Sequence, residues 1–348
     1  MKIAVGLKRS EQIYNTEYLR FLRQIGVAHV IGYACPEDQV SSKDGYWSYE
    51  DLARMVKHYK DNGLVIDGIE NLPPRLWLNI LHDGPDRQRE IDNVRRTIEN
   101  MGKAGIPTLG YNFSLTGCPE RYDEPVGRAG VSSVVYDEAK YPQKYKCMPR
   151  SMTWNSVIDP DAKGCFPPVS REEMRDRLYR FLDDVMPSAV DAKVALAAHP
   201  EDPPVPYIYS MGRVLITPED FDEMLARYDT PYCSVEFCQG TFTEMGVDIY
   251  DTIRHYAEMG RIAYVHMRNV AGKLPRYAEV MIDDGDVDMA RAFRTYYEAG
   301  YRGSFIPDHY PELSAMTDNA ASLAFTIGYM RGTLMAAGIP IWGRDYVD

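Results

Sequence analysis

Side chains that bind metals or transfer protons stand at the ends of several predicted strands. Those end positions hold Glu70, Asn112, His199, Cys238, His266 and Asp308, with His309 directly after Asp308. Imidazole nitrogen, thiolate sulfur and carboxylate oxygen are the protein ligands that first-row transition metals take. If four strands each deliver one such ligand to a common rim, the side chains can form a coordination shell. The pattern therefore predicts a divalent metal site.

Each of these residues, taken alone, has a plainer interpretation. A lone histidine at a strand end is more often a hydrogen-bonded structural residue than a ligand, and free cysteine is among the most buried residue types. Two histidines, one thiol and an Asp-His pair on four consecutive strand ends favour the metal site instead. The other histidines begin a strand or fall on helices and loops, and we predict structural roles for His29, His58, His82 and His255.

The neighbours of these ligands extend the predicted site. Because side chains alternate along a strand, an inward Cys238 turns Glu236 inward, and an inward His266 turns Arg268 the same way. An arginine there could hold a substrate carboxylate with two hydrogen bonds. His199 ends its strand before the proline-rich "PEDPPVP", which is stiff enough to hold the ring, and we expect the acidic pair 201–202 simply to begin the turn, with a role behind the metal as the alternative.

Short β-rich runs alternate with amphipathic runs along the whole chain, which predicts parallel strands joined by helices. The expected strands cover residues 3–7, 29–34, 64–70, 108–113, 194–199, 232–238, 262–269 and 303–309. Helices are expected from the Ser48 cap to Gly63 and after the Thr217 cap, with Pro218 in the first turn. Eight β/α units predict a (β/α)₈ TIM barrel, an α/β fold whose active site lies at the C-terminal ends of the strands.

One segment breaks this rhythm. Residues 114–169, after the fourth strand, are rich in Gly, Pro, Tyr and Cys. An excursion of this length is usually functional, and we predict a lid-like insertion that orders on ligand binding. Barrels routinely exceed about 250 residues as one domain, so residues 1–348 are interpreted as a single TIM-barrel domain.

Composition restricts the partners. The chain is 45% apolar and 26% charged, contains no long apolar run, and has a net charge of -12. This charge and the lack of a long apolar run argue against nucleic-acid or membrane partners but allow a small acid in a local basic pocket.

The start "MKIAVGLKRS" lacks a signal sequence, which predicts a cytoplasmic location, and a homo-oligomer is possible. The six cysteines are far apart and are predicted to be thiols: Cys35, Cys118, Cys147, Cys165, Cys233 and Cys238.

The motifs "AAHPEDPP", "EFCQG", "YVHMRNV", "DDGDVDM", "PDH" and "IGYMRG" resemble, in order and spacing, those of the mannonate dehydratase family of xylose-isomerase-like barrels. The resemblance covers most of the chain. It implies dehydration of D-mannonate to 2-keto-3-deoxy-D-gluconate with a divalent metal, usually Mn²⁺, while Fe²⁺, Co²⁺ and Zn²⁺ are possible. The matching motif positions imply four metal ligands, namely His199, Cys238, His266 and Asp308.

Such a dehydration removes a proton beside a carboxylate and expels hydroxide from the next carbon. We predict His309 as the acid/base residue, and Arg268, Asn112 and Glu70 as substrate-binding residues. Two alternatives stay open. The same barrel could carry a sugar or sugar-acid isomerase or epimerase, or a sugar-acid-binding protein without catalysis.

Three positions depart from the family pattern. Ile306 stands where an arginine is typical, Ser114 and Leu115 follow the fourth strand where Met-Pro is typical, and Phe325 stands where a tyrosine is expected on the last helix. Phenylalanine has no hydroxyl for proton transfer. Either Tyr310 takes over the acid/base role, or the reaction differs.

Overall fold

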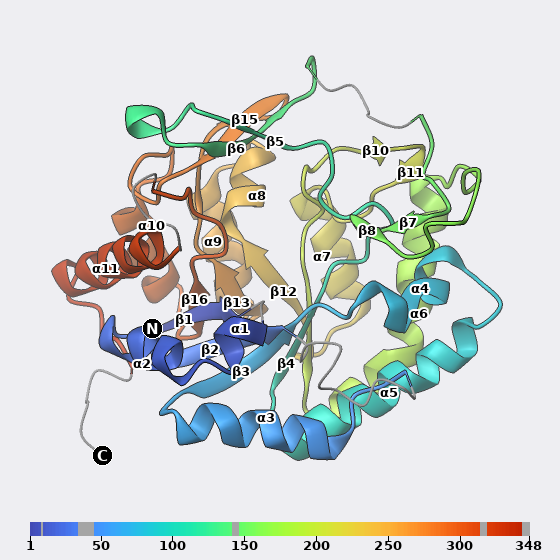
Figure 1. The fold of residues 1–348 in the computed structure, drawn as a ribbon, viewed down its shortest axis with the longest axis horizontal. Helices are drawn as coiled ribbons and strands as arrows, with labels where there is room; N and C mark the ends of the chain where they lie inside the picture. The colour runs from blue at the N-terminus through green and yellow to red at the C-terminus, as the bar shows by residue number, and fades with distance from the viewer. Residues whose placement is uncertain (8–9, 34–44, 141–145, 314–318, 343–348) are drawn as a thin grey trace.

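Eight parallel strands close into a barrel in the computed structural model, which describes residues 1–7, 10–33, 45–140, 146–313 and 319–342 (Figure 1). Around the barrel the strands follow the order β1-β16-β13-β12-β9-β4-β3-β2. Their bounds are β1 Lys2–Leu7, β2 His29–Tyr33, β3 Val65–Glu70, β4 Thr108–Tyr111, β9 Ala195–Ala198, β12 Cys233–Cys238, β13 Ile262–His266 and β16 Ser304–Ile306. The predicted (β/α)₈ barrel is confirmed, because all eight expected strands are present.

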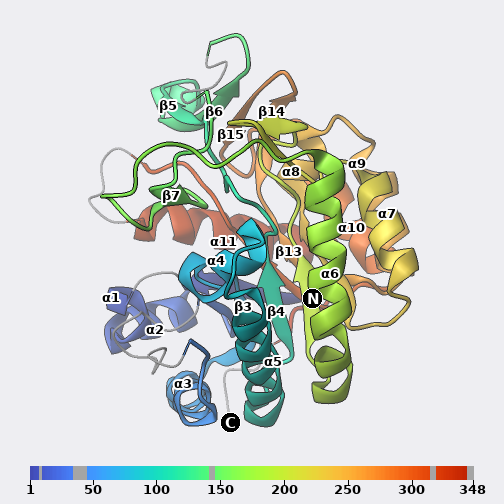
Figure 2. The same ribbon diagram turned by 90° about the vertical axis from the view of Figure 1, so that its right-hand side faces the viewer.

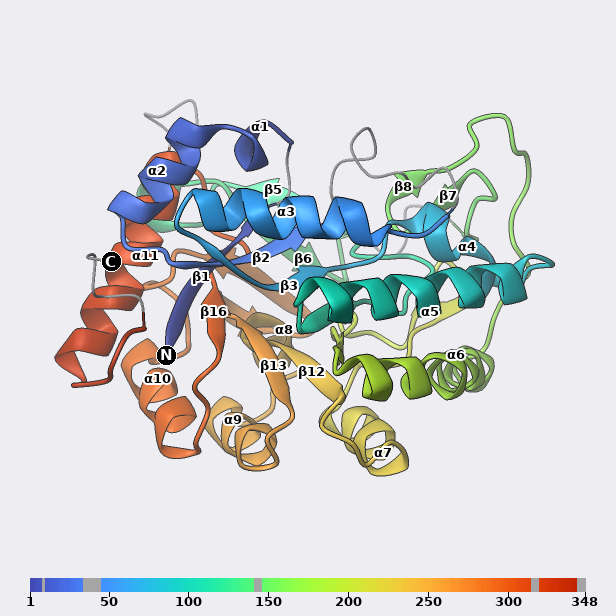
Figure 3. The ribbon, with the colours of Figure 1, turned by 90° about the horizontal axis from the view of Figure 1, so that it is seen from below.

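Helices lie outside the strands, as the view from below shows (Figure 3). Their bounds are α1 Ser10–Ile13, α2 Thr16–Gln24, α3 Tyr49–Asp61, α4 Pro74–His82, α5 Arg87–Ala104, α6 Arg171–Ala192, α7 Pro218–Arg227, α8 Gln239–Glu244, α9 Ile249–Glu258, α10 Met289–Glu298 and α11 Ala320–Ala336. The predicted caps are confirmed: the Ser48 side chain accepts from the Asp51 amide, and Thr217 forms a capping box with Asp220. Among the described ranges, no helix is long and apolar enough to cross a membrane.

The order of side chains inside the barrel explains why the predicted ligands face the mouth of the barrel at the strand ends. Ala4, Ile31, Ala197, Tyr264 and Ile306 form one buried cluster from five strands. Because side chains alternate with a period of two, the residue two positions after an inward residue also faces inward. This places residues 199, 266 and 308 in the next layer toward the C-terminal mouth.

Several strands end earlier than predicted. β9 stops at Ala198 and β16 at Ile306, so His199 and Asp308 lie just beyond their strands. Pro200 and Pro307 explain this, since proline has no N–H to donate to a neighbouring strand. The expected strand 262–269 is two strands, β13 and β14, which residues 267–268 separate.

The segment 114–169 contains its own strands, β5 Tyr122–Glu124, β6 Ser133–Asp137, β7 Met152–Thr153 and β8 Ser156–Val157. β6 pairs with β15 (Arg276–Val280), which pairs with β14 (Asn269–Lys273), so a four-stranded sheet has the order β14-β15-β6-β5. Figures 1 and 2 both show this sheet beyond one end of the barrel. The insertion is thus anchored to a hairpin from the second half of the chain.

The prediction of free cysteines is wrong for Cys147 and Cys165, which form a disulfide with a Cα–Cα distance of 5.9 Å. The cause is local. The Phe166 amide donates to the Met148 carbonyl and the Arg150 amide to the Gly164 carbonyl, so two antiparallel segments bring the cysteines together. Cys118, Cys233 and Cys238 are free thiols as predicted, and Cys35 lies outside the described residues.

Candidate active site

Three predicted ligands meet at the C-terminal mouth of the barrel. His199, Cys238 and His266 each offer a ligand atom within 4.8 Å of the other two, and the two imidazole ring centres are 5.1 Å apart. Their strands β9, β12 and β13 are adjacent in the barrel, and Cys238 is in register with His266. Side chains separated by many residues in sequence therefore form one compact cluster.

Asp308 belongs to a second, overlapping group. Asp308, Glu70 and His266 also offer ligand atoms within 4.8 Å of one another. One Asp308 oxygen lies 3.3 Å from His266 Nδ1. Glu70, predicted to bind substrate, accepts a 2.6 Å hydrogen bond from the Tyr33 hydroxyl and lies 3.5 Å from His266 Nε2. Glu70 therefore contacts the ligand cluster itself.

The electrostatic surroundings favour the ligand form of Cys238, whereas His199 must give up a proton to bind a metal. Burial alone would raise the pKa of the Cys238 thiol, but the Arg268 guanidinium and His199 hold it well below its usual range. The pKa of His199 rises to about 9 against the effect of burial, because the Cys238 sulfur lies beside it. A thiolate is the form of cysteine that binds metals.

Backbone contacts orient the His199 ring. His199 Nδ1 lies 2.5 Å from the Pro200 carbonyl oxygen, so a hydrogen on Nδ1 is donated there and Nε2 is left for a metal. The Asn112 amide also donates to that carbonyl, at 3.2 Å. Asn112 Oδ1 is buried and makes no hydrogen bond to any residue that the structure describes, so it is available to the substrate that Asn112 is predicted to bind.

Buried nitrogen atoms without hydrogen bonds indicate that the cluster can hold a divalent metal. Both ring nitrogens of His266 lack a hydrogen bond of normal geometry within the described part of the chain, although carboxylate oxygens of Glu236 and Asp308 lie 2.8 and 3.3 Å away. Such atoms are costly unless something binds them. Two imidazoles, a thiolate and a carboxylate are the ligand types that transition metals take.

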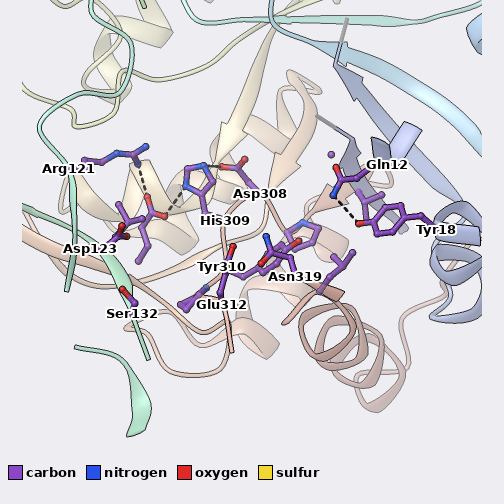
Figure 4. A pocket seen from close by; sticks show the side chains of 17 residues that line it. Gln12, Tyr18, Arg121, Asp123, Ser132, Asp308, His309, Tyr310, Glu312 and Asn319 are labelled. Carbon is purple, nitrogen blue, oxygen red and sulfur yellow. Dashed lines mark hydrogen bonds and ion pairs between the residues drawn. The ribbon is translucent and has the colours of Figure 1, made fainter. Parts of the chain in front are cut away.

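Two adjoining cavities open onto this cluster. A cavity of about 140 Å³ is lined by Glu70, Asn112, His199 and His266, and a larger one of about 600 Å³ lies next to it. Arg121, Asp308 and His309 line both. Figure 4 shows the larger cavity, with Arg121 and Asp123 on one side and Gln12 and Tyr18 on the other.

Of the two predicted acid/base residues, His309 lines both cavities and Tyr310 lines the larger one. His309 is one-third exposed, with Nδ1 2.8 Å from a Glu279 oxygen and Nε2 3.5 Å from Asp308 Oδ2. Tyr310 lines the larger cavity beside it (Figure 4). Both side chains can therefore reach a ligand that spans the two cavities.

The structure does not bring Phe325 to the site. It lies on α11 with 37% of its surface exposed, whereas Leu323 and Asn319 line the larger cavity. The prediction that Phe325 occupies the proton-transfer position is therefore wrong. Ile306, a second of the three departures, is buried in the barrel interior and lines neither cavity.

Arg268 is not placed as a substrate clamp. It lines neither cavity, is 1% exposed, and pairs with Glu244 at 2.7 Å and Asp202 at 2.8 Å. The prediction assumed that the strand continues past residue 266. The chain instead leaves the barrel after His266 to form β14, and the guanidinium pairs with the buried Asp202 and Glu244 outside both cavities.

Arg268→Met is expected to lower the free energy of unfolding by about 3–5 kcal/mol, because it leaves buried carboxylates without their partner. Urea unfolding of the purified variant measures this. A matched control is Arg227→Met, which breaks an exposed pair with Asp183 at 3.0 Å and should cost less than about 1 kcal/mol. Equal stability of Arg268→Met and the wild type would contradict the structural role.

The expectation that residues 201–202 only begin a turn is wrong. Glu201 and Asp202 are 2% and 1% exposed. Glu201 pairs with Arg213 at 2.9 Å, and Asp202 accepts from Arg268 and from the Tyr277 hydroxyl at 2.9 Å. The loop after His199 is thus fixed by buried charge pairs.

Sequence reasoning missed two residues at the site, Arg121 and Glu279. Arg121 comes from the insertion and lies 3.0 Å from Asp202 and 2.7 Å from Glu279. A signal existed for Glu279: in "RYAEV" it shares one strand face with Tyr277, and both are buried. The predicted structural histidines behave as expected, for example His29 with Asp67 at 2.9 Å and His255 with Asp222 at 2.8 Å.

Comparisons with known proteins identify the family of the chain. A family model described as D-mannonate dehydratase (UxuA) matches residues 13–337. The chain is 27% identical over 319 residues to a mannonate dehydratase of Thermotoga maritima, covering 85% of this chain and 86% of that protein. It is 26% identical over 277 residues to mannonate dehydratase 2 of Halalkalibacterium halodurans, covering 76% and 79%.

Solved structures show the same fold. Mannonate dehydratase from Streptococcus suis superposes with a TM-score of 0.78 at 22% identity, covering 100% of this chain and 97% of that one. An L-ribulose 3-epimerase superposes with a TM-score of 0.58 at 15% identity, covering 97% and 96%. At these sequence identities the structural similarity supports the fold and no functional assignment.

Proposed function

Because this chain belongs to the D-mannonate dehydratase (UxuA) family, we propose that it converts D-mannonate to 2-keto-3-deoxy-D-gluconate and water. The chain is an enzyme of the lyase class that acts on a sugar acid. The observation that best supports a metal-dependent site is the cluster of His199, Cys238 and His266 beside cavities that His309 also lines. The assignment of D-mannonate follows the names of the relatives.

The proposed metal ligands are His199, Cys238, His266 and Asp308, with Mn²⁺ as the expected ion. A divalent ion there supplies a Lewis acid and a template for the negative charge that develops beside the substrate carboxylate. Contacts within the protein orient two of these ligands. The Pro200 carbonyl orients His199, and the Thr241 hydroxyl donates to the Cys238 sulfur at 3.1 Å.

The chain's own groups supply the proton transfers in this proposal. His309 exchanges a proton with the substrate from the boundary of the two cavities, and Tyr310 offers a hydroxyl toward the leaving group from the larger cavity. Glu70 and Asn112 line the smaller cavity and hold the substrate end nearest the metal. The rest of the six-carbon chain extends into the larger cavity, where Gln12, Tyr18 and Asn319 offer hydrogen bonds to its hydroxyls.

Incubation of the purified protein with D-mannonate and Mn²⁺ tests this proposal. We expect a 2-keto-3-deoxy acid, detected by its reaction with thiobarbiturate and identified by NMR. An isomeric sugar acid with no keto acid would support an epimerase instead. Saturable binding without any product would support a binding protein. Other hexonates in a parallel panel show whether mannonate is preferred.

The role of the insertion, the cellular location and the oligomeric state remain predictions. Residues 114–169 are proposed to cover the mouth and to become less accessible to protease when substrate binds, because Arg121 of this segment contacts groups beside the site. A cytoplasmic location and a homo-oligomer are also predictions.

A further inference from the structure

The His309 ring is held by a residue of the accessory sheet. His309 Nδ1 lies 2.8 Å from Oε2 of Glu279, which is 4% exposed and stands on β15. β15 pairs on one side with β14, where Glu279 is opposite Val270, and on the other side with β6 of the insertion. We infer that Glu279 is a positioning residue for His309, an inference that rests on the proposed proton-transfer role of His309.

The contact determines which ring nitrogen can serve the substrate. A carboxylate accepts, so Nδ1 carries the hydrogen that is donated to Glu279. Nε2 is then the nitrogen left for proton exchange, and it lies on the side of Asp308, 3.5 Å from Oδ2. A histidine bonded in this way keeps one tautomer and one ring orientation, as in other carboxylate–histidine pairs that act on a third group.

Glu279 is itself held in place. Its second oxygen, Oε1, accepts from Arg121 at 2.7 Å and lies 3.3 Å from Arg268. Both arginines also contact Asp202, at 3.0 and 2.8 Å. Because both carboxylate oxygens have partners, the Glu279 side chain cannot rotate without breaking a buried charge pair. The insertion, through Arg121, therefore helps to fix the acid/base histidine.

Glu279→Gln should lower kcat on the true substrate by about 10- to 100-fold, the range typical of residues that orient a functional histidine. Bound metal should stay close to wild type, because Glu279 is none of the proposed ligands and does not line the smaller cavity. Glu279 lines the larger cavity, but both its oxygens are engaged by His309 and Arg121, so KM should change less than kcat. Glu279→Asp keeps the charge but withdraws the carboxylate by one methylene, so its kcat should lie between those of Glu279→Gln and wild type.

A double-mutant cycle separates positioning from a general effect on the fold. If Glu279 acts through His309, adding Glu279→Gln to His309→Gln should change kcat by less than about 3-fold. The matched control is Asp222→Asn, which removes the carboxylate from the exposed His255–Asp222 pair of the same 2.8 Å length and should leave kcat unchanged. Circular dichroism and urea unfolding establish that each variant is folded.

The outcomes separate this inference from the proposed function. Wild-type turnover of His309→Gln would refute the role of His309 itself. A large loss in His309→Gln together with wild-type kcat in Glu279→Gln would overturn only the inference, and so would equal losses from Glu279→Gln in both backgrounds. If Glu279→Gln does not fold, Glu279→Asp takes its place in the cycle, and wild-type kcat there would overturn the inference.

Discussion

Removal of both imidazoles from the metal cluster, in a His199→Ala, His266→Ala variant, is expected to reduce bound metal to the level of chelator-treated protein and to abolish turnover. The two rings and the Cys238 sulfur converge within 4.8 Å, so their loss leaves too few ligands for a transition metal. Mass spectrometry of metal content and calorimetric titration of the apo protein with Mn²⁺ measure binding directly, independently of activity.

Cys238→Ser tests the same metal site by replacing one proposed ligand instead of two. A neutral hydroxyl is a poor substitute for a thiolate. Substitution of residues that only hydrogen-bond to a metal ligand lowers the affinity for metal by about 10- to 100-fold. Loss of a direct ligand should therefore lower the affinity for Mn²⁺ by at least about 10-fold. The control is a His58→Ala, His255→Ala variant, which removes two histidines of the outer helices and should bind metal normally. Full metal occupancy of the His199→Ala, His266→Ala variant would refute the ligand assignment.

The barrel and its ligand cluster could be predicted because they follow from local patterns. A period of two along each strand and the closure of eight strands suffice to bring residues such as His199 and Cys238 to one rim. The position of each ligand depends only on where its own strand ends, and Pro200 and Pro307 mark two of those ends in the sequence.

The surroundings of the cluster could not be predicted in this way, because they depend on pairing between distant segments. Tyr136 of β6 is opposite Tyr277 of β15, and this pairing brings Arg121 and Glu279 together. Nothing local indicates that register. The same gap explains the error at Arg268: the chain leaves the barrel after His266 to form β14, and the arginine turns toward Asp202 and Glu244 instead of the cavity.

The second large effect is expected at His309. His309→Gln should lower kcat by about 10²- to 10⁴-fold, the usual contribution of a positioned acid or base. Glutamine can still form hydrogen bonds but cannot exchange a proton near neutral pH. Metal content should stay at the wild-type level, since the ring contributes none of the proposed ligand atoms. Steady-state kinetics with keto-acid detection measure the loss.

Tyr310→Phe shows whether one residue or two carry the proton transfers. If the Tyr310 hydroxyl protonates the leaving group, its removal should lower kcat by at least about 10²-fold, with packing preserved because only one atom is lost. Phe325→Tyr is the control: residue 325 lies exposed on α11, so a hydroxyl there should neither raise turnover nor rescue Tyr310→Phe. If Tyr310→Phe retains wild-type kcat while His309→Gln does not, His309 serves as both base and acid. Unchanged kcat in both variants would move the proton transfers to other groups of the cavities.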